Sequence, residues 1–237
     1  MKKIILVMMF VSSLMYAETA EVRLIREKEN IIGSLDQSIA ISAGMQDITI
    51  STDNMHVAYI VRSQGRPHIY WNNKNDFPYD DIKIDSIIFS PNGNHLAYIA
   101  NLYGKWMVVL NGSPQGQYED IKSNSLKFSP DSKRLAYIAK GFSGWCVVVN
   151  KKPGKAYEFI KEDSISFSPD SIHISYIAGF YNQYFIVLDE QKGSEYNMFV
   201  SNAKIIWDSP TMYHYLAISN KRDIYVITEK IEKVEKK

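Results

Sequence analysis

Several features are scarce or missing in this sequence, and each absence removes a class of protein. Cysteine occurs once, at Cys146 in an apolar stretch, so the chain cannot form an intramolecular disulfide and we expect a buried, inert thiol. Neither sign of charge is in excess, because 27 lysines and arginines face 26 aspartates and glutamates. A balanced chain gives no basis for a nucleic-acid partner. The motifs of serine hydrolases, zinc peptidases, dithiol oxidoreductases and phosphate-binding loops are also missing, so the sequence predicts no catalytic residue, no cofactor and no metal.

Apolar runs long enough to cross a membrane are missing too. The longest apolar run lies at the N-terminus. Basic residues 2–3, the apolar run 4–11 and Ala17 follow one another in the order of a signal peptide. The run is far shorter than the roughly 20 residues of a membrane-crossing helix. We therefore expect a signal peptide over residues 1–17, a periplasmic or secreted protein, and no integral membrane segment. Cleavage after Ala20 and an uncleaved N-terminal anchor remain open.

A repeat of 39 residues organises the rest of the chain. Phe-Ser-Pro-Asp or Phe-Ser-Pro-Asn recurs at Phe89, Phe128 and Phe167, and each copy leads into an apolar strand with a central tyrosine. Weaker copies at Ile50 and Trp207 bring the count to five, the last one shifted by two residues. Such a period is typical of repeat architectures. We expect one domain over residues 18–237, with repeats near 47–82, 83–121, 122–160, 161–200 and 201–228 and a charged tail at 229–237.

Each repeat predicts four short strands. The first ends at Phe-Ser, Pro-Asp forms a hairpin turn, and the second strand carries the central tyrosine. The expected third strands are Trp106–Leu110, Trp145–Val149 and Tyr184–Leu188, and the fourth strands carry Tyr79, Tyr118, Tyr157 and Tyr196. No window has a helical period, so the predicted class is all-β. Because one such sheet cannot bury both of its faces, the sheets must stack as the blades of a β-propeller.

The number of blades depends on how the ring closes. The fifth repeat has an expected third strand at Asp223–Thr228 but no fourth strand. The alternating segment Ser38–Ala43 lies one period before Tyr79, so we expect it to supply that strand and to pair with Asp223–Thr228. This favours five blades closed by an N-terminal strand. Further apolar residues within 22–33 leave six blades open.

The motif Phe-Ser-Pro-Asp-x-x-x-Leu-Ala-Tyr at Phe128–Tyr137 is similar to the WD-repeat-like motif of TolB-type propellers from the bacterial envelope. The resemblance covers residues 47 to about 228. That family usually has glycine after the turn aspartate, whereas only Gly93 keeps it and Ser132 and Ser171 replace it. TolB itself has an additional N-terminal α/β domain, for which residues before 47 leave no room, so we do not expect TolB itself. The motif is specific for the blade and unspecific for the function, and TolB's partners cannot be transferred to this chain. Since catalytic motifs are missing, we expect a monomeric binding or scaffolding module for protein partners of the envelope, and not an enzyme.

Aromatic residues recur in the loop between the second and third strands, at Tyr103, Phe142 and Tyr181. Clustered exposed aromatics are typical of interfaces and sugar-binding surfaces. The alternative is that they fold back onto the neighbouring blade, and the sequence leaves both interpretations open.

A second candidate site consists of Asp85, Asn124 and Asp163, which recur in the loop that enters the innermost strand. Such a loop borders the central channel, where these acceptors could meet a cation or a sugar. The alternative is that each side chain caps its own loop. The three lysines two positions earlier are expected to be solvated: Lys83, Lys122 and Lys161. A glycan-binding protein or a glycosidase that uses these acids is the second function considered, although Asp85 and Asp163 belong to blades that are not adjacent.

Four histidines, His56, His95, His173 and His214, share one repeat position, and Arg134 occupies it in the remaining repeat. Equivalent positions on packed sheets lie roughly 10 Å apart, whereas zinc needs its ligand nitrogens at about 2 Å. We therefore expect a solvated shoulder of the hairpin rather than a metal ring.

Overall fold

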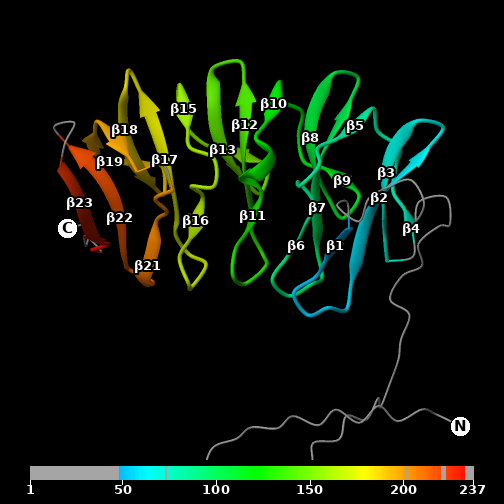
Figure 1. Cartoon of the computed structure of the whole chain (residues 1–237), viewed down its shortest axis with the longest axis horizontal. Coiled ribbons are helices and arrows are strands. Elements are labelled where there is room, and N and C mark those ends of the chain that lie inside the picture. The colour runs from blue at the N-terminus through cyan, green and yellow to red at the C-terminus, as the bar shows by residue number, and fades with distance from the viewer. Residues whose placement is uncertain (1–47, 73, 201, 220–222, 233–237) are drawn as a thin grey trace, which may run out of the picture. The chain divides into compact units, whose positions relative to one another are not determined.

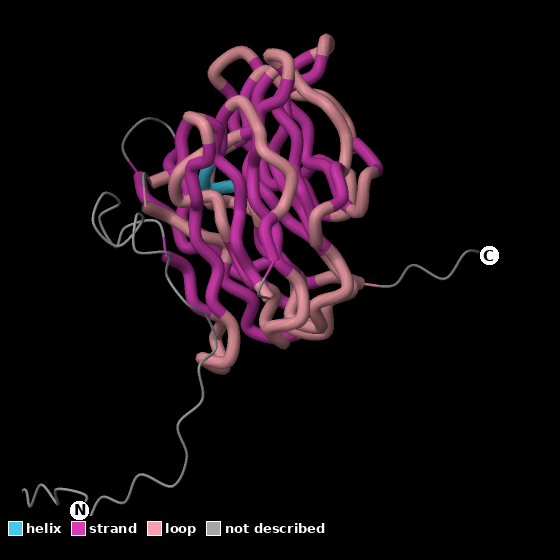
Figure 2. The backbone as a smooth tube through the Cα atoms, turned by 90° about the vertical axis from the view of Figure 1, so that its right-hand side faces the viewer, coloured by secondary structure: helices cyan, strands magenta, loops and turns pink. Residues whose placement is uncertain are grey.

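The structure is a computed structural model that describes residues 48–72, 74–200, 202–219 and 223–232 (Figure 1). These residues form five antiparallel sheets, and one turn of 3-10 helix at Ser123–Ser125 is the helical element among them. Figure 2 shows the same predominance of strands and connecting loops. Within these ranges no helix has the length and hydropathy that a membrane crossing requires. The predicted all-β class is confirmed.

The sheets follow the chain, one for each repeat. The first sheet comprises β1 (Ile48–Ile50), β2 (Val57–Ser63), β3 (Arg66–Trp71) and β4 (Lys74–Asn75). The second comprises β5 (Asp81–Ile82), β6 (Ile88–Phe89), β7 (Leu96–Leu102), β8 (Lys105–Leu110) and β9 (Ser113–Pro114). The third comprises β10 (Asp120–Ile121), β11 (Lys127–Phe128), β12 (Leu135–Gly141), β13 (Gly144–Val149) and β14 (Lys152–Pro153). The fourth comprises β15 (Phe159–Ile160), β16 (Ser166–Phe167), β17 (Ile174–Phe180), β18 (Gln183–Leu188) and β19 (Gln191–Tyr196). The fifth comprises β20 (Met198–Phe199), β21 (Ile206–Ser209), β22 (Met212–Ser219) and β23 (Asp223–Lys230).

The middle sheets are the predicted four-stranded blades, with one addition and one correction. The fourth strands β4, β9 and β14 end before Tyr79, Tyr118 and Tyr157, and only β19 contains its predicted tyrosine, Tyr196. Tyr118 and Tyr157 instead form isolated bridges with Trp106 and Trp145 of the third strands. In the second sheet β5 and β6 both pair with β7, which pairs with β8, which in turn pairs with β9. The first strand of the blade is therefore interrupted into two short pieces, and the third and fourth sheets repeat this pattern. The hairpins between second and third strands lie at one end of the sheets and the Ser-Pro turns at the other (Figure 1).

Buried tyrosines join each sheet to the one before it. Tyr98, Tyr137, Tyr176 and Tyr215 are at most 1% exposed. Each ring meets, edge to face, the ring of the tyrosine 19 positions earlier, with centroids 5.9–6.2 Å apart and planes at 71–76°. Apolar side chains of consecutive sheets surround these pairs in continuous clusters. Edge-to-face pairs contribute about 0.5–1.5 kcal/mol each beyond the area they bury. The thiol of Cys146 lies in one of these clusters, and burial raises its pKa, as expected for an inert cysteine.

The repeat position that carries most of the histidines also joins neighbouring sheets. The expectation that these side chains form a solvated shoulder of the hairpin was therefore wrong. His95 stacks on Phe128 of the next sheet, His173 stacks on Trp207, and the guanidinium of Arg134 lies 4.9 Å from the ring centre of Phe167. His56 meets Phe89 in a tilted arrangement. His214 does not share this place, because it lies one residue before the buried Tyr215, whereas His173 lies three residues before Tyr176. Its Nδ1 lies 2.8 Å from the carboxylate of Asp208 in its own sheet.

The serines that replace glycine in the turn have a role of their own. Ser132 and Ser171 adopt left-handed φ angles of 64° and 63°, close to the 72° of Gly93. The Ser132 hydroxyl accepts the N–H of Asn92 at 3.1 Å, and the Ser171 hydroxyl accepts the N–H of Asp131 at 2.9 Å. Each serine thus binds the turn of the preceding sheet. This hydrogen bond offsets part of the cost of a left-handed residue that has a Cβ.

The shift predicted for the fifth repeat is confined to its first hairpin. Tyr215 lies 39 residues after Tyr176 and occupies the same buried position, so β22 is in register. Trp207 lies 40 residues after its counterpart Phe167, while Ala203 keeps the spacing of 39 from Ser164, with the same turn hydrogen bond. One extra residue is therefore inserted between Ala203 and Trp207.

The last sheet bears on the question of closure. Among the described strands, β22 is the partner of β23. Ile224 and Val226 on β23 are 65% and 69% exposed, whereas Ile186 on the corresponding strand of the fourth sheet is 1% exposed. Residues 22–33 and Ser38–Ala43 lie outside the described residues, so the closing strand and the number of blades stay predictions. The exposed face of β23 is a surface that the closing segment would cover.

A shortened chain tests the closing strand. A variant that begins at Met45 should expose the edge and apolar face of β23 and therefore form aggregates, visible as higher-mass species in size-exclusion chromatography with light scattering. Adding Ile224→Thr and Val226→Thr to it should reduce the aggregation. If the shortened chain stays monomeric with an unchanged melting temperature, the N-terminal segment does not close the domain.

The turn carboxylates accept hydrogen bonds that lower their pKa values. The Ser129 hydroxyl donates to Asp131 at 2.6 Å, and the Lys133 N–H donates to the same oxygen at 3.1 Å; together they lower the pKa of Asp131. The equivalent contacts of Asp170 lower its pKa as well. Asn92 makes the same contacts without a charge.

The variant Asp131→Asn with Asp170→Asn should fold like the parent and lose part of its acid sensitivity. A carboxyl with a lowered native pKa binds protons more readily in the unfolded chain, so its stabilisation is present above pH about 4 and is lost as the pH falls below it. Melting temperatures measured from neutral to acidic pH should converge for parent and variant at low pH. Parallel curves would show that these turns do not contribute.

Candidate functional site

The three aromatic residues predicted at hairpin tips point into solvent. Tyr103, Phe142 and Tyr181 are 85%, 100% and 89% exposed. They lie in two-residue loops between β7 and β8, β12 and β13, and β17 and β18. The alternative in which they fold back onto a neighbouring blade is not observed. We call these three side chains the aromatic rim.

Two of the rim loops are held by carboxylates. Tyr103 and Tyr181 have left-handed φ angles of 53° and 48°. Their N–H groups donate to Asp80 at 2.7 Å and to Glu158 at 3.0 Å, respectively. A left-handed tyrosine is unfavourable by about 1–2 kcal/mol, and these charge-assisted bonds hold the loop in place. Phe142 instead lies between Gly141 and Gly144, and it is not among the residues with positive φ.

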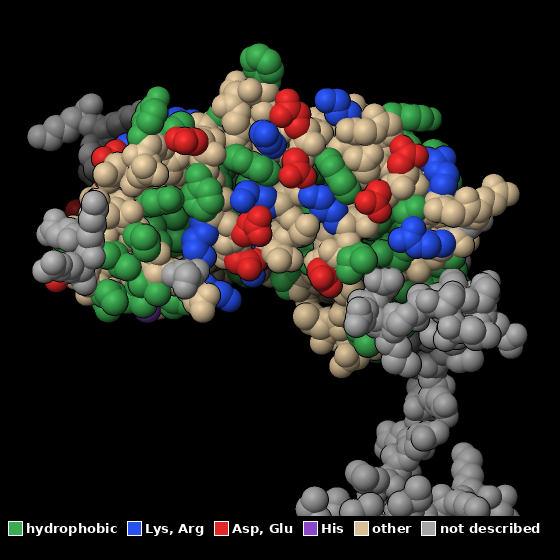
Figure 3. Space-filling view, turned by 45° about the horizontal axis from the view of Figure 1, so that its top comes forward, with side chains coloured by type: hydrophobic (Ala, Val, Ile, Leu, Met, Phe, Trp, Pro, Cys, Tyr) green, Lys and Arg blue, Asp and Glu red, His purple; other side chains and the backbone are tan. Residues whose placement is uncertain are grey.

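Charged side chains surround this end of the sheets, and both signs are interspersed (Figure 3). Lys83 reaches Asp120 of the next sheet at 2.7 Å and lies 4.5 Å from the centre of the Trp106 ring. Lys122 in the same way reaches Glu162 at 3.2 Å and lies over Trp145. Their side chains are 18% and 14% exposed, so the expectation that they are solvated was wrong. These lysines connect neighbouring sheets.

The interruption in the first strand of each blade is held by a repeated serine. Ser86, Ser125 and Ser164 each donate at 2.6 Å to the carbonyl oxygen three residues earlier. Each hydroxyl also accepts an N–H from the second strand at 3.0–3.1 Å, from Ile99, Ile138 and Ile177 respectively. The hydroxyl thus replaces the missing backbone pairing. These serines were not identified from the sequence, although their spacing of 39 was visible there.

The serines leave the predicted acceptors free. Asp85, Asn124 and Asp163 are all exposed, and each directly precedes one of these serines. Asp85 and Asp163 have left-handed φ angles of 63° and 56°. None of the hydrogen bonds between described residues involves these three side chains, so the alternative in which they cap their own loops is not observed.

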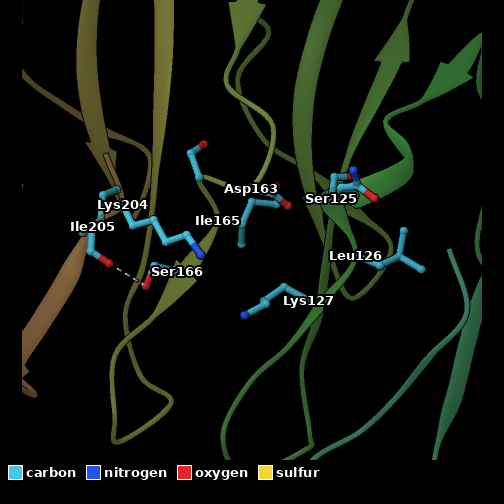
Figure 4. Close-up of a pocket in the computed structure, with 10 residues that line it drawn as sticks. Ser125, Leu126, Lys127, Asp163, Ile165, Ser166, Lys204 and Ile205 are labelled. Carbon is cyan, nitrogen blue, oxygen red and sulfur yellow. Dashed lines mark hydrogen bonds between the residues drawn. The ribbon is translucent and has the colours of Figure 1, made fainter. Parts of the chain in front are cut away.

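Two of these acceptors line a pocket of about 270 Å³ (Figure 4). Asn124 and Asp163 line it, whereas Asp85 does not. The full lining comes from the first strands of three successive sheets, namely residues 124–127, 163–166 and 204–205. The side chains of Lys127 and Lys204 reach into the space between these strands. Neither lysine was identified from the sequence. We call this site the inter-blade pocket.

The chemistry available in the inter-blade pocket is that of binding. Asp163 is the one carboxylate of the lining, whereas glycoside hydrolysis by the common route needs a pair about 5–10 Å apart. In the described part of the chain, histidine, cysteine and acidic side chains form no group that could hold a metal ion. The glycosidase alternative therefore gains no support from the pocket.

No family model and no curated protein matches the chain. Solved structures of similar fold include TolB from Acinetobacter baumannii, at 12% identity and a TM-score of 0.44, covering 79% of this chain and 54% of TolB. The propeller of Dos1 is 9% identical with a TM-score of 0.44, covering 77% of this chain and 54% of that structure. Prolyl oligopeptidase B from Galerina marginata is 16% identical with a TM-score of 0.44, covering 79% and 35%. The chain thus spans about half or less of each structure's length, and at these identities the likeness concerns the fold alone.

The repeated four-stranded sheets define the class of this protein: it has the all-β architecture of propeller blades. Among propellers, a TolB-like type fits its repeat motif, and TolB itself does not.

Removal of one bridging hydroxyl tests the construction of the pocket wall. Ser125→Ala leaves the buried N–H of Ile138 without its partner, while the carbonyl of Lys122 keeps the backbone N–H of Ser125 at 3.2 Å. The unsatisfied N–H should reduce stability by about 1–3 kcal/mol. Chemical denaturation should reveal this loss, with Ser123→Ala from the same 3-10 turn as the matched control. Equal stability of the two variants would show that the serine does not bridge the interruption.

Proposed function

We propose that this chain is a binding module that holds a protein partner through its aromatic rim, after export to the bacterial envelope. The observation that carries the proposal is the nearly complete exposure of Tyr103, Phe142 and Tyr181 at equivalent tips of three successive sheets. A propeller fold is compatible with a protein-interaction scaffold in general. We propose in addition that the contact surface is the aromatic rim and that the compartment is the bacterial envelope.

The free-energy cost of keeping large aromatic side chains in water supports the rim as a contact surface. A large aromatic side chain held in water forgoes the stabilisation that burial would provide, which is roughly 1.5–3 kcal/mol for a side chain of this kind. In the fold the tyrosines at the centre of the second strands are buried, as Tyr98 and Tyr137 illustrate. Interfaces concentrate their binding energy in such anchors and surround them with polar groups. The interspersed charges at this end of the sheets would form that polar border.

Export is supported by the order of charge and hydropathy in residues 1–17, which lie outside the described residues. The resemblance of the repeat motif to TolB-type propellers favours the same compartment. A module of this kind would meet its partner in the periplasm or outside the cell.

The rim is tested by the triple variant Tyr103→Ser, Phe142→Ser, Tyr181→Ser. Truncation of an anchor weakens binding by about 2 kcal/mol or more, so the triple variant should lose the proteins that crosslink to the parent chain in the envelope. The matched control is Met55→Ser with Ile172→Ser, two exposed apolar residues in the opposite turns. This control should keep full capture.

Melting temperatures separate binding from folding in this test. The rim side chains are exposed, so the triple variant should melt within a few degrees of the parent. A much lower melting temperature would mean that the rim packs against the protein itself. Unchanged capture by a stable triple variant would reject the rim as the interface.

A further inference from the structure

We propose that the inter-blade pocket binds a small ligand that carries one carboxylate together with neighbouring hydroxyl groups, a sugar acid being the simplest such molecule. The pocket is formed by first strands and their interruptions, whereas the aromatic rim is formed by hairpins between second and third strands. This site is therefore independent of the proposed protein interface.

The anionic part of the ligand follows from two lysines without acidic partners. Lys127 and Lys204 form no ion pair with any described residue, in contrast to Lys83 and Lys122, which are paired with acids of the next sheet. Figure 4 shows both amino groups directed into the same space. With Asp163 as the one acid of the lining, the pocket has an excess of one positive charge. One carboxylate on a ligand balances this charge and can accept hydrogen bonds from both ammonium groups.

Both lysines depart from the repeat, so the fold itself does not require them. Lys204 lies within the stretch that contains the extra residue of the fifth repeat, and Ile205 beside it is buried like Ile165 and Leu126. The insertion thus adds a charged side chain to the wall without removing an apolar one from the core. Lys127 stands where the neighbouring repeats have Ile88 and Ser166.

The hydroxyl groups of the ligand follow from the unpaired acceptors. The carboxylate of Asp163 and the amide of Asn124 line the pocket without hydrogen-bond partners among the described residues. Hydroxyl groups can donate to both, and a sugar acid offers hydroxyls next to its carboxylate. The volume of about 270 Å³ is just below the range of about 300–1,000 Å³ for drug-sized ligands, which matches a single sugar ring.

The probe is D-glucuronate, compared with uncharged D-glucose and with acetate, added to the full mature protein in low-salt buffer. Chemical shifts or heats of titration should show saturable binding of glucuronate in the millimolar range, typical of small polar ligands with few contacts. Glucose and acetate should each bind at least about tenfold more weakly, because each lacks one half of the contacts. Equal binding of acetate and glucuronate would overturn the role of the hydroxyl groups. Equal binding of glucose would overturn the role of the lysines.

Matched variants assign the binding to the pocket. Lys127→Gln and Lys204→Gln should each weaken glucuronate binding about tenfold, and Asp163→Asn should weaken the preference for glucuronate over acetate. Lys133→Gln, at an exposed turn outside the lining, is the control and should bind like the parent. Unchanged melting temperatures exclude misfolding of these variants. The proposal is wrong if the parent shows no saturable binding, or if the control and the pocket variants bind alike.

Discussion

The contact on which the rest of this structure depends is the edge-to-face pair of tyrosines between consecutive sheets. A four-stranded sheet leaves two apolar faces, and only a neighbouring sheet can cover each of them. The tyrosine 19 positions before each central tyrosine belongs to the segment that leads from one sheet to the next. The same pair of rings therefore fills the space between two sheets and fixes the position of one sheet relative to the next. This explains why Tyr215 keeps the spacing of 39: the extra residue between Ala203 and Trp207 is offset by a connection one residue shorter between Trp207 and Tyr215. Length can vary in the turns, but the ring positions cannot move.

Once the rings fix the sheets, function can reside in the places where the repeats differ. The first sheet has Gln64 and Gly65 at the hairpin tip where later sheets have an aromatic residue. The lysines of the inter-blade pocket likewise replace apolar or small residues, or enter with an insertion. By contrast, the serines at the strand interruption are the same in three repeats, and they hold the backbone. At the inter-blade pocket, the serines shared by the repeats hold the backbone, and the lysines that differ between repeats supply the candidate binding groups.

The same distinction explains what the sequence could predict. The 39-residue period revealed the all-β class, the strands and the tip aromatics, because each of these features lies within a single repeat. It did not reveal that Lys83 pairs with Asp120, or that His95 stacks on Phe128, because these contacts join two repeats across a distance that spacing does not measure. It also placed His214 with the other histidines, since each lies four residues after the turn proline or its equivalent, and Pro210 comes two residues later than the repeat requires. Lys204 was overlooked because it lies in the stretch that contains the extra residue.

The hydrogen bonds of the strand interruption also determine how the two proposed sites relate. Ser125 follows Asn124 in the pocket wall and holds the N–H of Ile138 on β12, the strand that leads to Phe142 at the rim. Ser164 makes the same connection between Asp163 and the strand that leads to Tyr181. A ligand could pass a displacement from pocket to rim only by stretching these buried bonds, and an unsatisfied buried group costs about 1–3 kcal/mol. A millimolar ligand binds with only about 4 kcal/mol in total, and it would have to spend much of that on one broken bond. The pocket and the rim should therefore bind independently, with the β-sheets as a rigid frame between them.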